Sequence, residues 1–170
     1  MWRSKIAVGK ARTRALLISG LTLGADQLTK RLIAMSFMPG QSLPLIPSLL
    51  SLTYVQNTGA AFGLLKGRQW LFIALSVMIV GWMGWELLTK RPLAAVVVWG
   101  SSLIIGGALG NLIDRLRVGH VIDFIDLHVW PVFNVGDSAI TIGVGLLILH
   151  SLWLNRGRGA GGERREERVG

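Results

Sequence analysis

Two aspartates in a largely apolar chain have the residue type and spacing that hydrolysis requires. Asp123 lies in the sequence GHVIDF, and Asp137 lies fourteen residues later in FNVGDS. A carboxylate beside apolar sequence is costly unless it is paired or functional, so this pattern favours an active role. Two carboxyl groups at close range share one proton, so one can act as a base toward water and the other as an acid toward a carbonyl. Such a pair can cut a peptide bond without a metal or a covalent nucleophile.

Each aspartate also has a purely structural interpretation. In NVGD, Asn134 can cap a helix and Asp137 can be its third residue, where the helix dipole favours a negative charge. Asp123 can be a solvated carboxylate in a loop. Both interpretations are compatible with catalysis. Because a helix start favours the ionised form of Asp137, we expect Asp123 to hold the shared proton.

Further polar residues accompany the two aspartates. Asp26 and Lys30 are four residues apart, so they share a helix face and can form an ion pair within a membrane. Asn111 and Arg115 have the same spacing, and Arg115 could hold a carbonyl or a lipid headgroup, or simply anchor a helix at the interface. Asp114 adjoins Arg115 and cannot face it on a helix, so we expect Asp114 to be a supporting group.

Two other chemistries are open at this point. His120, Asp123, Asp126 and His128 could ligate a metal, although their spacing matches no closed motif. Ser138 and His120 could act as nucleophile and base, but no nucleophile elbow or third partner is visible. The chain has no cysteine, which removes thiolate ligands, disulfides and a cysteine nucleophile. We expect neither a metal nor a cofactor.

The composition is typical of a membrane protein. Of the 170 residues, 51% are hydrophobic and 16% are charged, whereas a soluble domain carries roughly 25% charged residues. The net charge of +9 could suggest nucleic-acid binding. However, the basic residues lie in short runs beside apolar segments, without a basic stripe interleaved with aromatics, so we expect no nucleic-acid partner.

Four apolar segments are candidates for crossing a bilayer, which takes about 20 residues as a helix. The expected helices cover residues 15–38, 70–88, 93–112 and 138–154. The first qualifies only if Asp26 and Lys30 face protein or water. The sequence therefore predicts an all-α membrane protein with four transmembrane helices in one domain over residues 1–155. A disordered cytoplasmic tail is expected over residues 156–170, which are rich in Gly, Arg and Glu.

Loop charge predicts the orientation of these helices. Twelve of the eighteen Lys and Arg residues lie in the N-terminal tail, the turn at Lys90 and Arg91, and the C-terminal tail. These three segments fall on one side of a four-helix arrangement. Positive loops stay inside, so both termini are expected in the cytoplasm. The polar residues discussed above then converge at the extracytoplasmic leaflet.

Two segments are expected outside the membrane on that face. Residues 39–68 are rich in Pro, Gly and Ser, and apolar residues alternate with polar ones over 50–54, which predicts a small β-like cradle resting on the membrane. Residues 115–134 carry Asp123 in a mixed pattern and are expected as a surface segment between the third and fourth helices. The glycines over 106–110 are expected to allow close helix packing.

Five short motifs occur in order along the chain. They are DQLTK at 26–30, NTGAAF at 57–62, GGALGNLIDR at 106–115, GHVIDF at 119–124 and FNVGDSAI at 133–140. Each one alone is weak, but five in this order on a four-helix frame are specific. Over nearly its whole length the chain resembles lipoprotein signal peptidase, the type II signal peptidase of bacteria. One departure is Gly136, where that family usually has alanine.

The resemblance implies a multi-pass aspartic endopeptidase of the bacterial plasma (inner) membrane, with its active site toward the extracytoplasmic face. Such enzymes cut the signal peptide from diacylglyceryl prolipoproteins just before the lipidated cysteine, and globomycin-type peptides inhibit them by occupying the site. The resemblance implies that Asp123 and Asp137 are the catalytic pair, and that residues 39–68 help to hold substrate. We expect a monomer surrounded by membrane lipid. The supporting residues implied by the motifs are Asp26, Lys30, Asn57, Gly59, Asn111, Arg115 and Asn134.

Two other functions compete with proteolysis. A proton-coupled transporter or channel could use Asp26, Asp114 and Asp137 as a relay, but a relay needs ionisable groups through the whole membrane depth, and the chain has no paired repeats. A non-catalytic scaffold could bind a partner helix through the glycines over 106–110. Aspartate substitutions would then be harmless.

Overall fold

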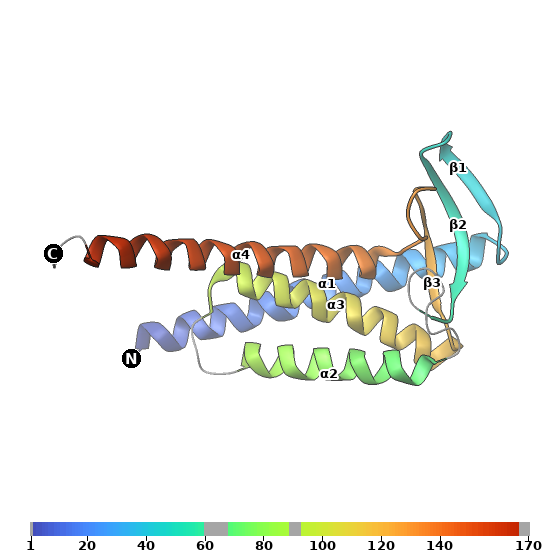
Figure 1. Cartoon of the computed structure of the whole chain (residues 1–170). Helices are drawn as coiled ribbons and strands as arrows, with labels where there is room; N and C mark the ends of the chain where they lie inside the picture. Colours follow the sequence, from blue (N-terminus) through green and yellow to red (C-terminus); the bar gives the residue numbers. More distant parts are fainter. Residues whose placement is uncertain (1, 60–67, 89–92, 167–170) are drawn as a thin grey trace.

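The computed structural model describes residues 2–59, 68–88 and 93–166. Within these ranges, four helices lie side by side and a small three-stranded sheet lies at one end of the bundle (Figure 1). The helices are α1 (Trp2–Ser36), α2 (Gln69–Leu88), α3 (Ala95–Val118) and α4 (Val135–Glu166). The strands are β1 (Ser42–Ile46), β2 (Leu50–Asn57) and β3 (Val121–Asp126).

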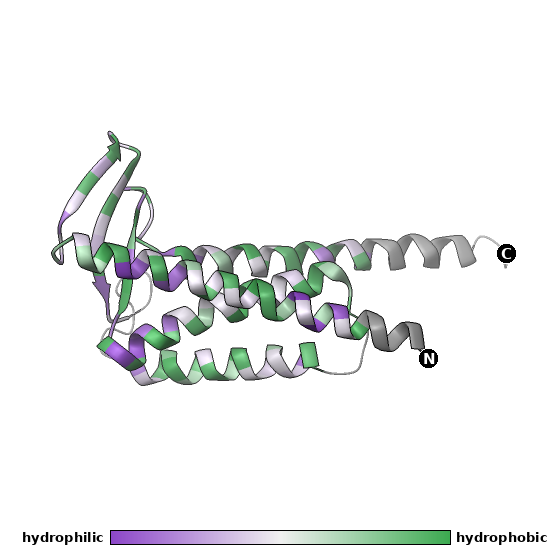
Figure 2. Ribbon diagram, turned by 180° about the vertical axis from the view of Figure 1, so that it is seen from behind, coloured by the Kyte–Doolittle hydropathy of each residue, from purple (hydrophilic) through white to green (hydrophobic). Residues whose placement is uncertain are grey.

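Three of the described helices are long and apolar enough to cross a membrane: α2, α3 and the Val135–Asn155 part of α4. Helix α1 differs because Asp26, Lys30 and Arg31 follow its apolar part. Figure 2 shows apolar residues along the bundle and hydrophilic residues on α1 and α3 next to the sheet. The start of α1 and the end of α4 lie at the opposite end of the bundle from the sheet (Figure 1).

The outer helices are longer than their apolar segments. Helix α1 begins at Trp2 rather than near residue 15, and α4 continues to Glu166, into the segment expected to be disordered. Backbone hydrogen bonding does not require an apolar sequence, so a helix can continue beyond the apolar layer. Hydropathy therefore located these helices but not their ends. The expected turn residues Lys90 and Arg91 lie outside the described residues.

Helix α3 also extends past its expected end near residue 112, and it stops at Gly119. Gly119 has a φ of 80°, the left-handed conformation that glycine adopts without steric strain and that commonly ends a helix. The chain then enters β3 directly. This short connection places β3 beside the end of α3.

The predicted β-like cradle is present in its described part, where β1 and β2 form an antiparallel hairpin. The third strand, β3, comes from the segment predicted only as a surface connection, and it pairs antiparallel with β2. The sequence pattern missed β3 because its burial does not alternate cleanly along the strand. Its pairing partner also lies more than sixty residues earlier in the chain.

A small hydrophobic core joins the sheet to the bundle. Ile33 of α1, Tyr54 of β2 and Phe124 of β3 are buried together. Side chains alternate across a strand, so the neighbouring residue Asp123 is directed to the other face of β3. The core therefore holds β3 against α1 and turns Asp123 toward the ends of α3 and α4.

Helix α3 lies at the centre of the bundle and packs against the other three helices, and its glycines bring it close to α1 and α4. A methyl group added at Gly107 would overlap the carbonyl oxygen of Gly136 on α4. One added at Gly110 would overlap the carboxylate of Asp26 on α1, and one added at Gly106 would lie 2.7 Å from the carbonyl oxygen of Ser19 on α1. The close packing predicted for these glycines is confirmed.

Replacing Gly107 by alanine should therefore destabilise the bundle. The new methyl group meets backbone, which cannot rotate away, so we expect a loss of about 1–3 kcal/mol in the free energy of unfolding. Gly145→Ala is the matched control, because among the described residues its added methyl group meets nothing within 4 Å beyond its chain neighbours and the adjoining backbone of α4. Thermal unfolding in detergent would compare the two variants. Equal unfolding temperatures would show that α3 and α4 are not packed this closely.

Candidate active site

Asp137 is positioned by the capped start of α4. The side-chain oxygen of Asn134 accepts a hydrogen bond of 2.8 Å from the backbone N–H of Asp137. In return, the backbone N–H of Asn134 donates to Asp137 Oδ2 at 3.3 Å. This reciprocal arrangement is a capping box, with aspartate in place of the usual glutamate. The capping interpretation of NVGD is confirmed, and the cap holds the Asp137 carboxylate in one orientation.

Asp123 reaches the same place from β3. Its side chain is 2% exposed, so the alternative of a solvated loop carboxylate is wrong. Asn57 Nδ2 donates to Asp123 Oδ2 at 2.8 Å, and Asn134 Nδ2 donates to Asp123 Oδ1 at 2.6 Å. Asn57 ends β2, the neighbour of β3 in the sheet, so strand pairing brings it to the carboxyl group.

Two asparagines connect the two aspartates. Asn134 contacts Asp137 through its backbone and Asp123 through its side chain. Asn111 of α3 donates to Asp137 Oδ1 at 2.7 Å, and its own side-chain oxygen accepts from Asn134 at 3.2 Å. Both carboxyl groups are thus tied to one amide network. Four elements that are separate in the sequence therefore meet at this network: β2, β3, α3 and the start of α4.

Both aspartates line one pocket of about 260 Å³. Asn57, Asn111 and Arg115 add further polar groups to its wall. The remaining wall is mainly apolar and is formed by Val121, Trp130, Pro131, Val132, Phe133, Ile140 and Thr141. The pocket therefore offers polar contacts for a peptide group and apolar contacts for a hydrocarbon group of the same ligand.

Burial controls the ionisation of Asp123. Desolvation, followed by the nearby charge of Asp137, raises the pKa of Asp123 from 3.8 to about 7. Hydrogen bonds from Asn57 and Asn134 oppose this rise without cancelling it. Near neutral pH, the Asp123 carboxyl therefore keeps its proton in a substantial fraction of molecules.

This raised pKa predicts how stability depends on pH. Asp123 binds its proton more tightly in the folded chain, so its contribution to stability is complete below about pH 4 and is lost as the pH rises through about 7. Asp123→Asn removes this ionisation. Above pH 7 we expect the free energy of unfolding of the variant to exceed that of wild type by up to about 4 kcal/mol. This difference should shrink as the pH falls toward 4. Unfolding of both proteins in detergent between pH 4 and pH 8 tests the prediction. A difference between the two free energies that stays the same at every pH would contradict it.

A buried ion cluster lies beside the aspartate pocket. Lys30 Nζ is 2.8 Å from Asp26 Oδ2 and 2.8 Å from Asp114 Oδ2, so the predicted Asp26–Lys30 pair is confirmed and Asp114 joins it. Lys30 also donates to Asn111 Oδ1 at 2.7 Å. Because Lys30 occupies that oxygen, the NH₂ group of Asn111 is turned toward Asp137. The backbone N–H of Gly136 donates to Asp26 Oδ1 at 2.7 Å, which links α1 to α4.

Arg115 extends from α3 toward the aspartate pocket, in a different direction from Asp114. Its guanidinium donates to the carbonyl oxygens of Asn111 at 3.3 Å and Gly59 at 3.5 Å. It also lies 5.0 Å from the ring centre of Phe72. These contacts hold a half-buried positive charge on the wall that Asp123 and Asp137 share. Residues 60–62 of the NTGAAF motif lie outside the described residues.

Sequence reasoning missed Gln27. Its amide donates to Asp114 Oδ1 at 2.9 Å and to the carbonyl oxygen of Gly110 at 3.1 Å. Gln27 is three residues before Lys30, so a stricter use of helical spacing would have placed both on the face toward Asp114. Its partner could not have been named, because that pairing is between helices.

The four proposed metal ligands do not come together as a set, although His128 Nδ1 lies 3.5 Å from Asp126 Oδ1. Asp123 and Asp126 lie three apart on β3 and therefore on opposite faces. Asp126 instead accepts hydrogen bonds from Thr53 and from the backbone N–H of His128, both at 2.9 Å. Among the described residues, no three His, Asp or Glu side chains are grouped as metal ligands. The hydroxyl of Ser138 donates to the carbonyl oxygen of Asn134, so the serine alternative also lacks its base.

Comparisons with known proteins agree with this geometry. The family model described as signal peptidase (SPase) II matches residues 18–153, a range that contains every residue of the site. A lipoprotein signal peptidase from Halothermothrix orenii is 47% identical over 128 residues, covering 75% of this chain and 87% of the relative. One from Moorella thermoacetica is 48% identical over 135 residues, covering 78% and 88%.

A solved structure described as a bacterial membrane enzyme, determined by the in meso method, has a TM-score of 0.77. It is 36% identical in sequence, and the match covers 81% of this chain and 87% of that one. This chain and that experimentally determined protein therefore share the same fold. Together, the family match and the close relatives show that the chain belongs to the signal peptidase II family of membrane proteases that process lipoproteins.

Proposed function

We propose that this chain is an aspartic endopeptidase that cleaves the signal peptide from diacylglyceryl-modified prolipoproteins, just before the lipidated cysteine. One observation carries the proposal. Asp123 and Asp137, from different elements, line the same pocket and are both bound by Asn134. Two carboxyl groups held this way by one residue are suited to sharing a proton.

In the proposed reaction, a water molecule binds between the two carboxyl groups. Asp137 is the base, and its carboxylate is oriented at the start of α4 by hydrogen bonds from Asn111 and Asn134. It takes a proton from water as the oxygen attacks the scissile carbonyl carbon. Asp123 starts protonated and donates its proton to the carbonyl oxygen. The proton on Asp137 then passes to the leaving amine as the C–N bond breaks, and the carbonyl re-forms as Asp123 recovers its proton.

The surrounding residues have supporting roles in this proposal. Asn57 and Asn134 orient Asp123, and Asn111 orients Asp137. The guanidinium of Arg115 can bind a carbonyl of the substrate next to the scissile bond. The cluster of Asp26, Lys30 and Asp114 keeps Asn111 in place, and Gly59 supports Arg115 and Asn57 through its backbone.

We infer the placement in the membrane from the same arrangement. Four helices span the bacterial inner membrane, with both termini in the cytoplasm and the aspartate pocket at the extracytoplasmic leaflet. Support comes from the three long apolar helices, and from the positions of the sheet and the helix termini at opposite ends of the bundle (Figure 1). The chain works as a monomer, and globomycin-type peptides inhibit it by occupying the pocket.

Cleavage of two peptides by the purified chain tests the proposal. The first is a prolipoprotein peptide with a diacylglyceryl cysteine, and the second has the same sequence with an unmodified cysteine. We expect the first to be cut before its cysteine, the second to be spared, and EDTA to leave the rate unchanged. Absence of cleavage, together with ion flux in proteoliposomes, would favour the transporter alternative. Loss of activity in EDTA that zinc restores would favour metal chemistry.

A further inference from the structure

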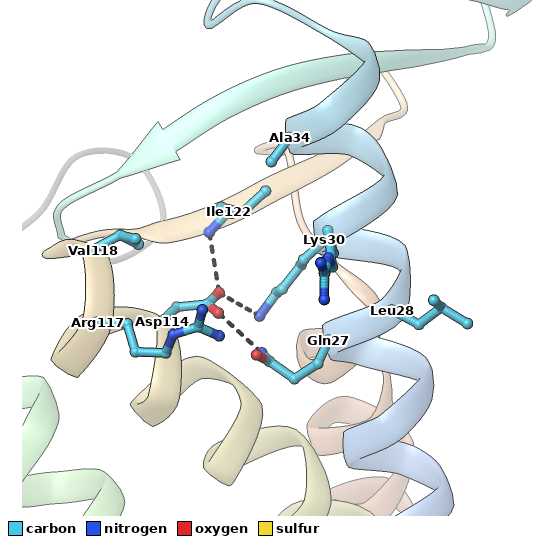
Figure 3. A pocket seen from close by; sticks show the side chains of 9 residues that line it. Gln27, Leu28, Lys30, Ala34, Asp114, Arg117, Val118 and Ile122 are labelled. Carbon is cyan, nitrogen blue, oxygen red and sulfur yellow. Dashed lines mark hydrogen bonds and ion pairs between the residues drawn. The ribbon is translucent and has the colours of Figure 1, made fainter.

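A second pocket of about 540 Å³ lies between α1 and α3 (Figure 3), and β3 separates it from Asp123 and Asp137. Alternation along the strand separates the two pockets, because Asp123 lines the first and Ile122 lines the second. Among the described residues, the two pockets have no lining residue in common. The second pocket is lined by Gln27, Leu28, Lys30, Arg31, Ala34, Asp114, Arg117, Val118 and Ile122.

Two arginines at this pocket have no partner among the residues that the structure describes. Arg31 and Arg117 are exposed, and neither forms a hydrogen bond or ion pair with any described residue. Lys30 differs, because Asp26 and Asp114 already neutralise it within the cluster. The rim of the pocket therefore carries two positive charges that are free to bind an anion. Paired arginines are well suited to a phosphate group, which accepts several hydrogen bonds at once.

An apolar stripe leads away from the pocket along α1. Leu17, Leu21 and Leu28 are 60%, 73% and 60% exposed, and their spacing of four and seven residues places them on one helix face. Arg31 follows Leu28 by three residues and so continues the same face outward. Helix α1 thus presents a cation at the sheet end of the bundle and hydrocarbon beneath it.

We propose that this pocket binds the phosphate of an anionic phospholipid, with an acyl chain lying along the α1 stripe. Arg31 and Arg117 donate hydrogen bonds to the phosphate oxygens. The stripe favours a lipid over free phosphate, because only a lipid places hydrocarbon directly below its charge. In the membrane placement proposed above, the site lies where the apolar helix α3 ends, at the level of the lipid headgroups. This proposal does not depend on the catalytic role of Asp123 and Asp137.

Native mass spectrometry of the purified full chain in detergent tests this site. The probes are phosphatidylglycerol and phosphatidylcholine with identical acyl chains, which differ in net charge. We expect wild type to retain phosphatidylglycerol preferentially. Arg31→Gln and Arg117→Gln should each weaken that retention roughly tenfold, and the double variant should abolish the preference. Arg68→Gln is the matched control, because Arg68 is exposed just before α2 and does not line the pocket.

Four results would overturn the proposal. Equal retention of the two lipids by wild type would show that charge is not recognised. An unchanged preference in the double variant, or an equal loss in Arg68→Gln, would place the lipid elsewhere. Displacement of phosphatidylglycerol by millimolar inorganic phosphate would identify a site for free anions instead. The single variants keep the test valid if the double variant unfolds, and thermal unfolding verifies the fold of each protein.

Discussion

Asparagine in place of either Asp123 or Asp137 should abolish cleavage while leaving the chain folded. Asparagine preserves the size of the side chain, but it neither takes a proton from water nor delivers one to a carbonyl. Acid–base groups contribute about 10²- to 10⁴-fold each, and the two act as a unit, so we expect a loss of about a thousandfold or more from either change. Initial rates with purified protein and a diacylglyceryl peptide measure this.

Asp126→Asn is the matched control for these two variants. Asp126 is on the same strand as Asp123, but it faces away from the pocket and contacts Thr53 and His128. Its cleavage rate should stay close to that of wild type. Loss of activity in all three variants would indicate a general effect on the sheet. Activity near the wild-type level in Asp123→Asn would contradict its role as the acid.

Lys30→Met should have the largest effect on stability. Lys30 is 2% exposed and pairs with Asp26 and Asp114, which are also buried. Methionine fills a similar volume but leaves two carboxyl groups without a cation. Removing one partner from a buried ion pair typically costs about 3–5 kcal/mol, and we expect a loss in that range. Thermal or denaturant unfolding in lipid-free detergent gives the value.

The neighbouring substitution Arg31→Met provides the control, because Arg31 is exposed and unpaired among the described residues. It should change stability by less than about 0.5 kcal/mol. Adding Asp114→Asn to Lys30→Met should recover part of the loss, since one buried carboxyl group is then removed. Equal stability of Lys30→Met and Arg31→Met would mean that the cluster contributes nothing to the fold.

Local spacing predicted the parts of the site that lie within one element. Asp26 and Lys30 are four apart on α1 and form the expected pair. Asn134 caps α4 with Asp137 as its third residue, as NVGD indicated. These interactions depend on a few consecutive residues, whose geometry in a helix is fixed by its period.

Contacts between elements could not be derived in the same way. Nothing in the spacing indicates that Lys30 reaches Asp114, or that Asn57 reaches Asp123, because both pairs depend on packing between distant segments. The proposed set of metal ligands depended on the same kind of contact. It combined Asp123 with Asp126, which are on opposite faces of β3, a strand that the sequence pattern did not reveal.

Single-turnover cleavage of a diacylglyceryl prolipoprotein peptide tests the central claim most directly. Purified wild type, Asp123→Asn and Asp137→Asn would each be mixed in excess over the peptide, and the products would be identified by mass spectrometry. We expect wild type to release a fragment that begins at the lipidated cysteine, and neither variant to release it. The same fragment formed by either variant at the wild-type rate would contradict catalysis by the aspartate pair.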